Sequence, residues 1–477
     1  MTTTLYWHDY ETWGADPRRD RPAQFAGIRT DTELNILGKP LVQYCRPADD
    51  MLPQPEACLV TGITPQKAFA EGLCEAEFMA EIHRQFMQPG TCGVGYNSIR
   101  FDDEFTRYGF YRNFFDPYGR EWRNGNSRWD IIDMLRLSHA LRPDGIQWPR
   151  HDDGSPSFRL EDITKANDIH HGEKHDALSD VQATIDLARL IREKHPRLYN
   201  YLFELRDKRR VAAQLNLQQA QMILHVSSMY PADIGCIAPV LPLAAHPTNK
   251  NGVIVFDLRH DPGPLLQLGV EEVQQRLFTR SDELPEGVER IPLKTIHMNK
   301  CPVVAPVNTL TLETAERWKI DLKAAQKNVD ELQGSPSLVR KIQEVHAGRD
   351  FTPISDPDQN LYGGGFFSDR DRSLMNEIVL MGAKDLARTG TQFEDPRLPE
   401  MLFRYRARNW PKSLSKEERE KWNQFRNNRL SNPDADSGIT LAQYQKQLAK
   451  MVMQPDIGDR ERKILSDLAD WPATIGL

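Results

Sequence analysis

The sequence lacks an apolar run that approaches the roughly 18 residues needed to span a bilayer. It also lacks, between Met1 and Trp7, the basic region and long apolar core of a secretory signal. We therefore expect a protein that does not enter or cross membranes and that remains in the cytoplasm.

Cysteine is scarce, and no two cysteines lie as close together as they do in zinc-binding or redox motifs. The six cysteines stand at positions 45, 58, 74, 92, 236 and 301. Each is predicted to be a small buried apolar side chain, with no disulfide and no zinc site.

An excess of positive charge is also missing, because 61 Lys and Arg face 68 Asp and Glu, for a formal net charge of −7. This balance argues against a protein that coats nucleic acid through global basicity. Any binding of nucleic acid must come from local patches.

The chain of 477 residues is too long for one hydrophobic core, since single cores stop growing at roughly 250–300 residues. Its patterns change near residues 196 and 349. We predict a mixed α/β sheet flanked by helices in residues 1–196, a smaller β-containing domain in 197–348, and a helical domain in 349–477.

Hydrophobic periodicity predicts the elements of these domains. Strands are expected at 5–12, 23–30, 34–44, 92–96, 222–226, 252–258 and 290–297, the first three as an antiparallel meander. Helices are expected at 75–86, near residues 102, 130 and 160, and from about 176, where Val181, Ile185, Ala188 and Ile191 share one face.

Two acids stand out in the first predicted strand, where Asp9 and Glu11 are two residues apart and therefore point to the same face of the sheet. Two like charges on one face are unfavourable unless a cation lies between them, and Mg²⁺ or Mn²⁺ prefers such oxygen ligands. Taken alone, the pair fits a solvated edge strand equally well.

A second acidic group follows the strand at 92–96, where Asp102, Asp103 and Glu104 open a predicted helix. Acids in a first turn commonly cap the helix or complement its dipole. The sequence itself does not say which of Asp102 and Asp103 points inward.

The third group lies at the start of the helix near 176. His175 falls just outside this helix, Asp176 is a candidate cap, and Asp180 lies one turn inside it.

Together the three groups form the pattern of the DEDDh exonuclease superfamily: Asp-x-Glu on a strand, Asp at a middle helix, and His-x-x-x-x-Asp at a late helix. Seven short segments resemble the bacterial exodeoxyribonuclease I family: His8 to Thr12, Arg21 to Phe25, Thr61 to Pro65, Arg100 to Glu104, Ser157 to Glu161, Asn299 to Val303 and Tyr405 to Asn409. The resemblance runs through nearly the whole chain.

This resemblance implies a fold and an activity. The fold is a ribonuclease H-like exonuclease domain, a small SH3-like domain and a C-terminal helical domain. The activity is processive 3′-to-5′ degradation of single-stranded DNA to 5′-mononucleotides in DNA repair and recombination. The implied partners are single-stranded DNA and single-stranded DNA-binding protein, and the expected state is a monomer.

The resemblance also assigns roles at the site. Asp9, Glu11, Asp102 and Asp180 would hold two Mg²⁺ ions, for which Mn²⁺ can substitute, and His175 would be the general base. Histidine suits this role because its reference pKa of about 6.5 lies near working pH.

Single-stranded DNA is expected to bind where arginines and aromatic rings alternate, because bases stack on rings while guanidinium groups contact phosphates. Arginines alternate there with eight rings: Tyr108, Phe110, Tyr111, Phe114, Phe115, Tyr118, Trp122 and Trp129. For any one ring, burial in the core is the more common explanation. The predicted DNA-contacting residues are Tyr96, Asn97, Arg100, Phe101, Arg107, Arg112, Arg404, Arg406 and Arg408.

Two other interpretations remain open. His171 and His175 are four residues apart, as on the metal-binding helix of an all-helical HD-type phosphohydrolase, although Gly172 weakens such a helix. Alternatively, the chain is a nucleic-acid-binding scaffold without catalysis, against which the complete set of four acids and a histidine argues.

Overall fold

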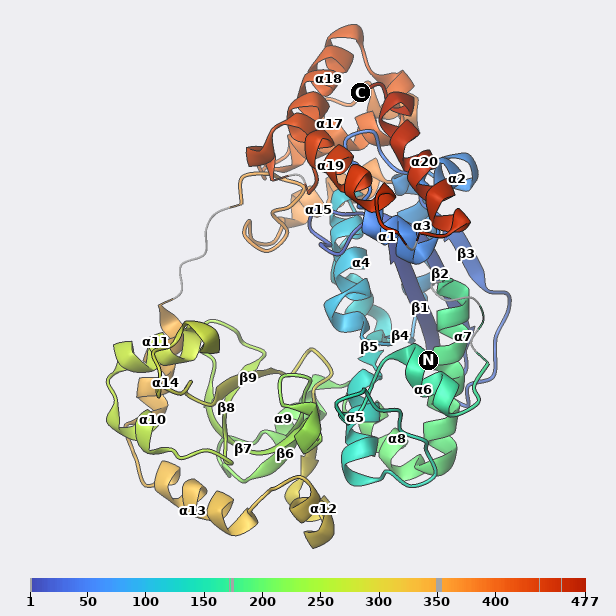
Figure 1. The fold of residues 1–477 in the computed structure, drawn as a ribbon. Helices are drawn as coiled ribbons and strands as arrows, with labels where there is room; N and C mark the ends of the chain where they lie inside the picture. Colours follow the sequence, from blue (N-terminus) through green and yellow to red (C-terminus); the bar gives the residue numbers. More distant parts are fainter. Residues whose placement is uncertain (1, 171, 173–175, 349–353, 437, 456) are drawn as a thin grey trace. The chain divides into compact units, whose positions relative to one another are not determined.

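The computed structural model describes residues 2–170, 172, 176–348, 354–436, 438–455 and 457–477. The chain folds into two compact units (Figure 1). Unit 1 contains Met1–Ser127, His170–Ile185 and Pro353–Leu477, and unit 2 contains Arg128–Ile169 and Asp186–Thr352.

The first sheet has the strand order β3-β2-β1-β4-β5, with β1 at its centre. Its strands are β1 (Thr4–Thr12), β2 (Pro22–Thr30), β3 (Leu41–Tyr44), β4 (Thr91–Gly95) and β5 (Ser127–Asp130). β1 runs antiparallel to β2 and parallel to β4. The predicted mixed sheet and its opening antiparallel meander are therefore confirmed.

The third strand is shorter than predicted, because it begins at Leu41 and not near Leu34. Leu34 has a positive φ of 69°, and the Asp31 carboxylate accepts hydrogen bonds from the backbone N–H groups of Glu33 and Asn35. A side chain that accepts hydrogen bonds from neighbouring backbone N–H groups offers these groups an alternative to the hydrogen bonds of a sheet. The chain therefore turns at this point before the strand begins.

The helices of the N-terminal part match the apolar periodicity of the sequence. They are α1 (Pro55–Thr61), α2 (Pro65–Glu71), α3 (Glu75–Phe86), α4 (Asp102–Arg112), α5 (Ile132–Leu141), α6 (Leu160–Ala166) and α7 (Ala177–Lys194). A core of Tyr6, Tyr10, Phe25, Phe78 and Phe86 joins one face of β1 to β2 and α3. This core fixes the register of β1 and directs Asp9 and Glu11 to the opposite face.

Unit 2 contains a second sheet of antiparallel strands, in the order β10-β6-β7-β8-β9. These are β6 (Ile223–Val226), β7 (Ile237–Ala245), β8 (Gly252–Asp257), β9 (Leu293–His297) and β10 (Val303–Pro306). The helices after α7 in this unit are α8 (Pro196–Glu204), α9 (Lys208–Gln214), α10 (Gly263–Gln267), α11 (Val270–Phe278), α12 (Leu312–Arg317), α13 (Leu322–Gln333) and α14 (Leu338–Ala347).

The sequence predicted β6, β8 and β9 but missed β10 and also β7, although β7 lies in the middle of the sheet. Pro239 and Pro242 interrupt its sequence, and proline counts against a central strand because it cannot donate to the ladder. The pairing of β7 with β8 shifts between Pro242 and Ala244. This irregularity is the kind of position at which a sheet tolerates proline.

The C-terminal part is helical, as predicted, since residues 354–436, 438–455 and 457–477 include no strand. Its helices are α15 (Asp369–Ile378), α16 (Ala383–Leu386), α17 (Leu398–Asn409), α18 (Lys416–Ser431), α19 (Leu441–Val452) and α20 (Asp459–Thr474). α19 and α20 share a buried cluster with Trp13 and with Cys58 of α1. These helices thus belong to the same compact unit as β1.

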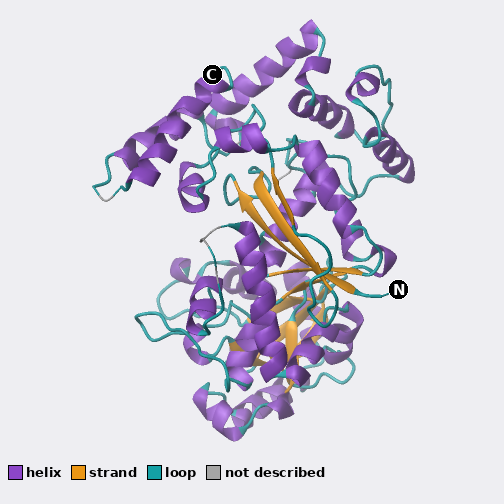
Figure 2. Ribbon diagram, turned by 90° about the vertical axis from the view of Figure 1, so that its right-hand side faces the viewer, coloured by secondary structure: helices purple, strands orange, loops and turns teal. Residues whose placement is uncertain are grey.

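The strands of the two sheets, drawn in orange in Figure 2, exclude the all-helical HD-type alternative. All six cysteines are free, as predicted; five are buried and Cys301 is half-buried. Among the described residues, every helix is too short or too polar to cross a membrane.

Candidate active site

The candidate site is built on the central strand β1, whose two faces are both largely covered. Asp9 is half-buried and Glu11 is buried. Their register against β2, with Asp9 opposite Ala26 and Glu11 opposite Gln24, is set by the aromatic core on the other face. Both carboxylates are therefore held on one face of a strand at the middle of the sheet.

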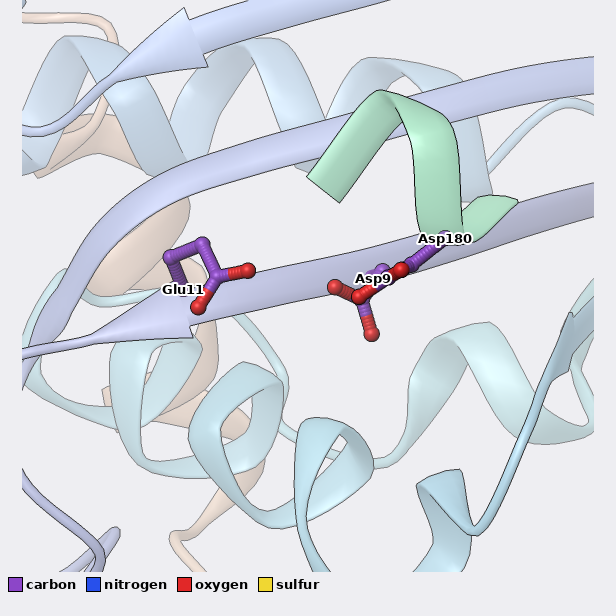
Figure 3. Close-up of side chains that lie close together, drawn as sticks. All are labelled: Asp9, Glu11 and Asp180. Atoms are coloured by element: carbon purple, nitrogen blue, oxygen red, sulfur yellow. The ribbon is translucent and has the colours of Figure 1, made fainter. Parts of the chain in front are cut away.

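A third carboxylate comes from α7, far along the chain. One potential ligand atom from each of Asp9, Glu11 and Asp180 lies within 4.8 Å of the other two (Figure 3). All the donor atoms are oxygens, which suit a hard divalent cation. The three acids that the sequence predicted at two distant motifs thus come together.

Asp102 and Asp103 occupy different environments at the start of α4. Asp102 is buried, and its Oδ1 accepts a hydrogen bond from the backbone N–H of Tyr10 at 3.1 Å. Asp103 is paired with Arg120, which is also fully buried, and lies 3.8 Å from Nε2 of His8. Asp102 therefore lies beside Asp9 and Glu11, whereas Arg120 neutralises Asp103.

A hydroxyl network joins α4 to β1 next to these acids. Oγ1 of Thr106 lies within hydrogen-bond distance of two oxygens. These are the Asp102 carbonyl oxygen, at 2.9 Å, and the Tyr10 hydroxyl oxygen, at 3.0 Å. Thr106 is fully buried. The start of α4 is thereby fixed against the strand that carries Asp9 and Glu11.

The carboxylates raise each other's pKa. Burial and then the charge of Asp102 raise the pKa of Asp9 well above its ordinary value. Burial, followed by the charges of Asp180 and Asp102, raises the pKa of Glu11 to about 9. Such a cluster is costly when ionised unless a cation offsets its charge, so the residues present fit a bound divalent cation.

The predicted general base, His175, lies outside the described residues, as does His171. The nearby Asp176 accepts a hydrogen bond from the backbone N–H of Ser179 at 3.3 Å, which agrees with its predicted capping role. Asp180 follows one turn later, where its backbone N–H donates to the Asp176 carbonyl oxygen.

Four of the predicted DNA-contacting residues lie immediately before Asp102. Tyr96 and Phe101 are half-buried, and Asn97 and Arg100 are exposed. Asn97 adopts a left-handed conformation with a φ of 60° as the chain leaves β4. Their contact with DNA stays a prediction.

The structure directs the other five predicted DNA-contacting residues inward. Arg107 pairs with Glu104 and Glu121, and Arg112 pairs with Glu75. Arg406 pairs with Glu418 through two hydrogen bonds of 2.8 and 3.1 Å. Each of these guanidinium groups is thus already paired with a carboxylate, and removal of one partner from a buried pair is costly.

Arg404 and Arg408 belong to a buried ion-pair network that joins the C-terminal helices to the N-terminal part of unit 1. Arg408 binds Asp50 at 2.8 Å and Asp358 at 2.6 Å. Arg404 binds Asp358 at 3.1 Å and Asp356 at 2.7 Å. Arg107, Arg112, Arg404, Arg406 and Arg408 therefore make internal ion pairs in the folded protein, and the DNA contact expected of them stays a prediction.

Electrostatics agrees with these ion pairs. Burial alone would raise the pKa of Asp50, but Arg21, Arg408 and Arg429 together hold it well below its ordinary value. The sequence pattern drew attention to the arginines but could not identify their acidic partners, because Asp50 and Arg408 are 358 residues apart in the chain.

We expect Arg408→Met to destabilise unit 1 by about 3–5 kcal/mol, because it leaves Asp50 and Asp358 buried with less compensating charge. Urea denaturation measures this loss. The control Arg419→Met removes an exposed arginine and should change stability by no more than about 0.5 kcal/mol. A stable Arg408→Met variant that instead binds DNA weakly would support the predicted DNA contact.

The aromatic stretch between residues 107 and 130 is mostly core. Five of its eight rings are buried, which confirms the more common explanation for them: Tyr108, Phe110, Tyr111, Phe114 and Trp129. Phe115 and Tyr118 are partly buried against hydrophobic clusters. Trp122 differs from all of them, because 63% of it is exposed.

Comparison with protein families shows the class of this fold and site. Residues 6–188 match the family model described as Exonuclease, which covers β1, α4 and the start of α7. Residues 206–348 match the Exonuclease I SH3-like domain, and residues 355–475 match the Exonuclease I C-terminal domain. The chain therefore carries an exonuclease fold followed by an SH3-like and a C-terminal helical domain.

Individual relatives make this class more specific. Exodeoxyribonuclease I of Escherichia coli is 48% identical over 425 residues, which is 89% of each chain. The structure of exonuclease I from Methylocaldum szegediense matches with a TM-score of 0.96 and 52% identity over 99% of each chain. The zinc-bound complex of E. coli exonuclease I with single-stranded DNA matches with a TM-score of 0.94 and 44% identity over 100% of each chain.

The chain belongs to the exodeoxyribonuclease I family.

Proposed function

We propose that this protein is a DNA exonuclease that degrades single-stranded DNA from its 3′ end and releases 5′-mononucleotides. The observation that carries the proposal is the convergence of Asp9, Glu11 and Asp180 on the central sheet. The chain is also similar along its whole length to an exonuclease I that was solved in complex with single-stranded DNA.

Asp9, Glu11, Asp102 and Asp180 are the proposed ligands of two Mg²⁺ ions, with Mn²⁺ as a substitute. Two such ions would stabilise the charge that develops on the attacking and leaving oxygens at phosphorus. The hydrogen bond from the Tyr10 N–H holds the Asp102 carboxylate beside the other acids before substrate arrives. A preformed set of donors lowers the cost of reorganisation during the reaction.

His175 is the proposed general base. Its ring nitrogen would take a proton from water as the water oxygen forms a bond to the phosphorus of the terminal nucleotide. The bond from phosphorus to the 3′-oxygen of the penultimate nucleotide then breaks. The products are a 5′-mononucleotide and a strand with a new 3′-hydroxyl.

Digestion of one single strand, labelled at its 5′ end or its 3′ end, tests this function. With Mg²⁺, the 3′ label should be released at once as a mononucleotide, while the 5′-labelled strand shortens progressively. A matched duplex and an RNA of the same sequence should remain largely intact, and EDTA should stop the reaction. Release of the 5′ label first, or no cleavage of any strand, would reject the proposed activity and favour a binding scaffold.

We expect Mg²⁺ to stabilise the protein more at high pH than at low pH. The folded pKa of Glu11, about 9, exceeds its ordinary value of 4.5, so the metal-free folded state binds more protons than the unfolded state between these values. Stability in EDTA should therefore fall as pH rises from about 5 to 9. Bound Mg²⁺ should oppose this fall, because it favours the ionised carboxylates.

Thermal unfolding in EDTA and in saturating Mg²⁺, at several pH values, measures this effect. The melting temperature should rise by roughly 3–8 °C at pH 8 when Mg²⁺ is about 100-fold above its Kd. A smaller rise is expected at pH 6. Equal rises at both pH values would show that these carboxylates do not hold the ion.

The biological setting is part of the same proposal. We infer processive action in DNA repair and recombination, in the cytoplasm, by a monomer that also contacts single-stranded DNA-binding protein. Domain boundaries near residues 196 and 349 are proposed as well. They lie close to the ends of the matched families at residues 188 and 348.

A further inference from the structure

Two of the proposed metal ligands each have a polar neighbour in the chain that points away from the site. His8 precedes Asp9 on β1, and its ring lies on the core side of the sheet, edge to face with Phe86 at 4.9 Å. Asp103 follows Asp102 at the start of α4. Nε2 of His8 lies 3.8 Å from Oδ1 of Asp103. The two neighbours therefore meet behind the acids that form the site.

Arg120 binds the second of these neighbours. It belongs to the short 3-10 helix η2 (Gly119–Glu121), and its side chain is fully buried. Nη2 of Arg120 donates a hydrogen bond to Oδ1 of Asp103, and the guanidinium group lies 4.6 Å from the Phe86 ring centroid. Within the described part of the chain, Nε and Nη1 of Arg120 find no hydrogen-bond partner. Asp103 is thus the carboxylate that compensates this buried positive charge.

The neighbouring strand leaves room for the guanidinium group. Gly93 of β4 lies opposite Tyr6 of β1 in the parallel register. A Cβ atom at position 93 would lie 3.1 Å from Nη1 of Arg120 and 3.0 Å from Cε1 of Phe86, which is closer than ordinary van der Waals contact. A glycine inside a strand often marks such a close approach. The sheet is therefore shaped to hold Arg120 at this position.

The first turn of α4 offers two adjacent acids to the metal site. Consecutive helical residues are about 100° apart around the axis, so a rotation of that size would exchange Asp102 and Asp103. Two contacts oppose the exchange. Arg120 binds Asp103 at the back, and the Tyr10 N–H donates to Asp102 at the front at 3.1 Å.

Loss of Arg120 would remove the contact at the back. Asp103 is fully buried, and a buried charge without a partner is strongly unfavourable. The first turn of α4 can relieve this cost by shifting, so that Asp103 moves toward water or toward the metal site. Because Asp102 is the adjacent residue, the same shift would draw it away from the Tyr10 N–H.

We propose that Arg120 is a positioning residue for the metal site. By holding Asp103 behind β1, it keeps the Asp102 carboxylate directed at Asp9 and Glu11. The inference rests on the proposed two-metal function, because it concerns one of the proposed ligands. Coulomb's law alone predicts the opposite effect, since loss of a nearby positive charge should favour a bound cation. The sign of the change in metal affinity therefore distinguishes positioning from simple electrostatics.

Titration of the DNA-free protein with Mn²⁺ tests this role without any cleavage, because electron paramagnetic resonance measures the ion that stays free. Arg120→Met should raise the Kd for Mn²⁺ about 10-fold or more, as loss of residues that orient metal ligands typically does. Arg120→Lys, which keeps a positive charge beside Asp103, should recover part of this affinity. Thermal unfolding shows which variants fold.

A double variant separates positioning from lost packing. In Arg120→Met/Asp103→Asn, the buried charge that would shift α4 is absent, so the Kd for Mn²⁺ should return to within about threefold of that of the unchanged protein. A defect caused only by the missing bulk of Arg120 would persist in the double variant.

Gly93→Ala keeps the test decisive if Arg120→Met does not fold. It retains both charges, but its methyl group must displace the guanidinium group of Arg120 or the ring of Phe86. A smaller rise in the Kd for Mn²⁺, of about two- to fivefold, is expected.

Arg21→Met is the matched control. Arg21 is also a buried arginine of the first sheet, and it binds Glu75 at 2.9 Å and Asp50 at 3.4 Å. Neither acid is adjacent in the chain to a proposed metal ligand. Its loss should lower the melting temperature, because it breaks buried ion pairs, but should leave the Kd for Mn²⁺ within about twofold.

Three results would overturn the inference. These are an unchanged or lower Kd for Mn²⁺ in Arg120→Met and in Gly93→Ala, equal rises in Arg120→Met and Arg21→Met, or a double variant that binds no better than Arg120→Met. If the unchanged protein binds Mn²⁺ but cleaves no strand, the proposed function fails, whereas these Kd values still decide the role of Arg120.

Discussion

Asp180→Asn is expected to reduce cleavage of single-stranded DNA on the order of 10³-fold or more at saturating Mg²⁺, and Asp9→Asn should do the same. One ligand atom from each of these residues lies within the same 4.8 Å cluster with Glu11. Removal of one charge should disrupt the metal site as a unit. The double variant should therefore lose little more activity than either single variant.

These variants should also be no less stable than the unchanged protein in EDTA. The carboxylates raise one another's pKa, so loss of one negative charge relieves repulsion in the metal-free state. Thermal unfolding in EDTA would show a melting temperature that is equal or higher. A loss of activity that accompanies a more stable fold cannot be attributed to unfolding.

Asp186→Asn is the control on the same helix. Asp186 lies on α7 but is half-exposed, with 40% of its side chain accessible, and pairs with Arg189 at 2.5 Å. Its substitution should leave cleavage within about twofold of the unchanged rate, because exposed pairs contribute little. If Asp9→Asn or Asp180→Asn retained activity within tenfold, these residues would have no place in the mechanism.

His175→Ala should lower the cleavage rate about 10²- to 10⁴-fold and change DNA affinity little, because a general base acts on the attacking water. The rate of the unchanged enzyme should rise through the titration of a histidine, whose ordinary pKa is about 6.5, as the neutral base forms. The variant should lose this rise while it still depends on Mg²⁺. Single-turnover rates across pH, with the Kd measured separately in EDTA, give both results.

His171→Ala is the control for the histidine. His175 lies five positions before Asp180, which belongs to the acidic cluster, whereas the acid five positions after His171 is Asp176, which caps α7. His171→Ala should therefore cleave at nearly the unchanged rate. Comparable losses in both variants, or an unchanged pH inflection in His175→Ala, would remove His175 from the role of base.

Prediction from the sequence succeeded where the signal was local. The bounds of α3 and the shared face of Asp9 and Glu11 follow from periodicities of 3.6 and 2 residues. The shortened β3 escaped prediction because a turn around Asp31 and Leu34 competes with the strand. The proline-containing β7 was not predicted because pairing with neighbouring strands, and not its own β-propensity, places it in the sheet.

The basic segment of α17 shows the main limit of prediction from the sequence. Arginines beside aromatic rings predict DNA contact when nothing is known of their surroundings. In the folded protein, Arg404 and Arg408 face Asp356, Asp358 and Asp50, and no spacing rule links residues so far apart in the chain. The exposed Trp122, only a few residues from several buried rings, could not be distinguished from them in advance.

By itself, the sequence determined the helical and strand segments, the family pattern and the set of acids that belong to the candidate site. Only the tertiary structure decided that Asp102 lies beside Asp9 while Asp103 is neutralised by Arg120, and which arginines remain near solvent. The physical reason is that local patterns control backbone conformation and the face on which a side chain lies. Burial and charge pairing instead depend on contacts between residues far apart in the chain, and these contacts exist only after folding.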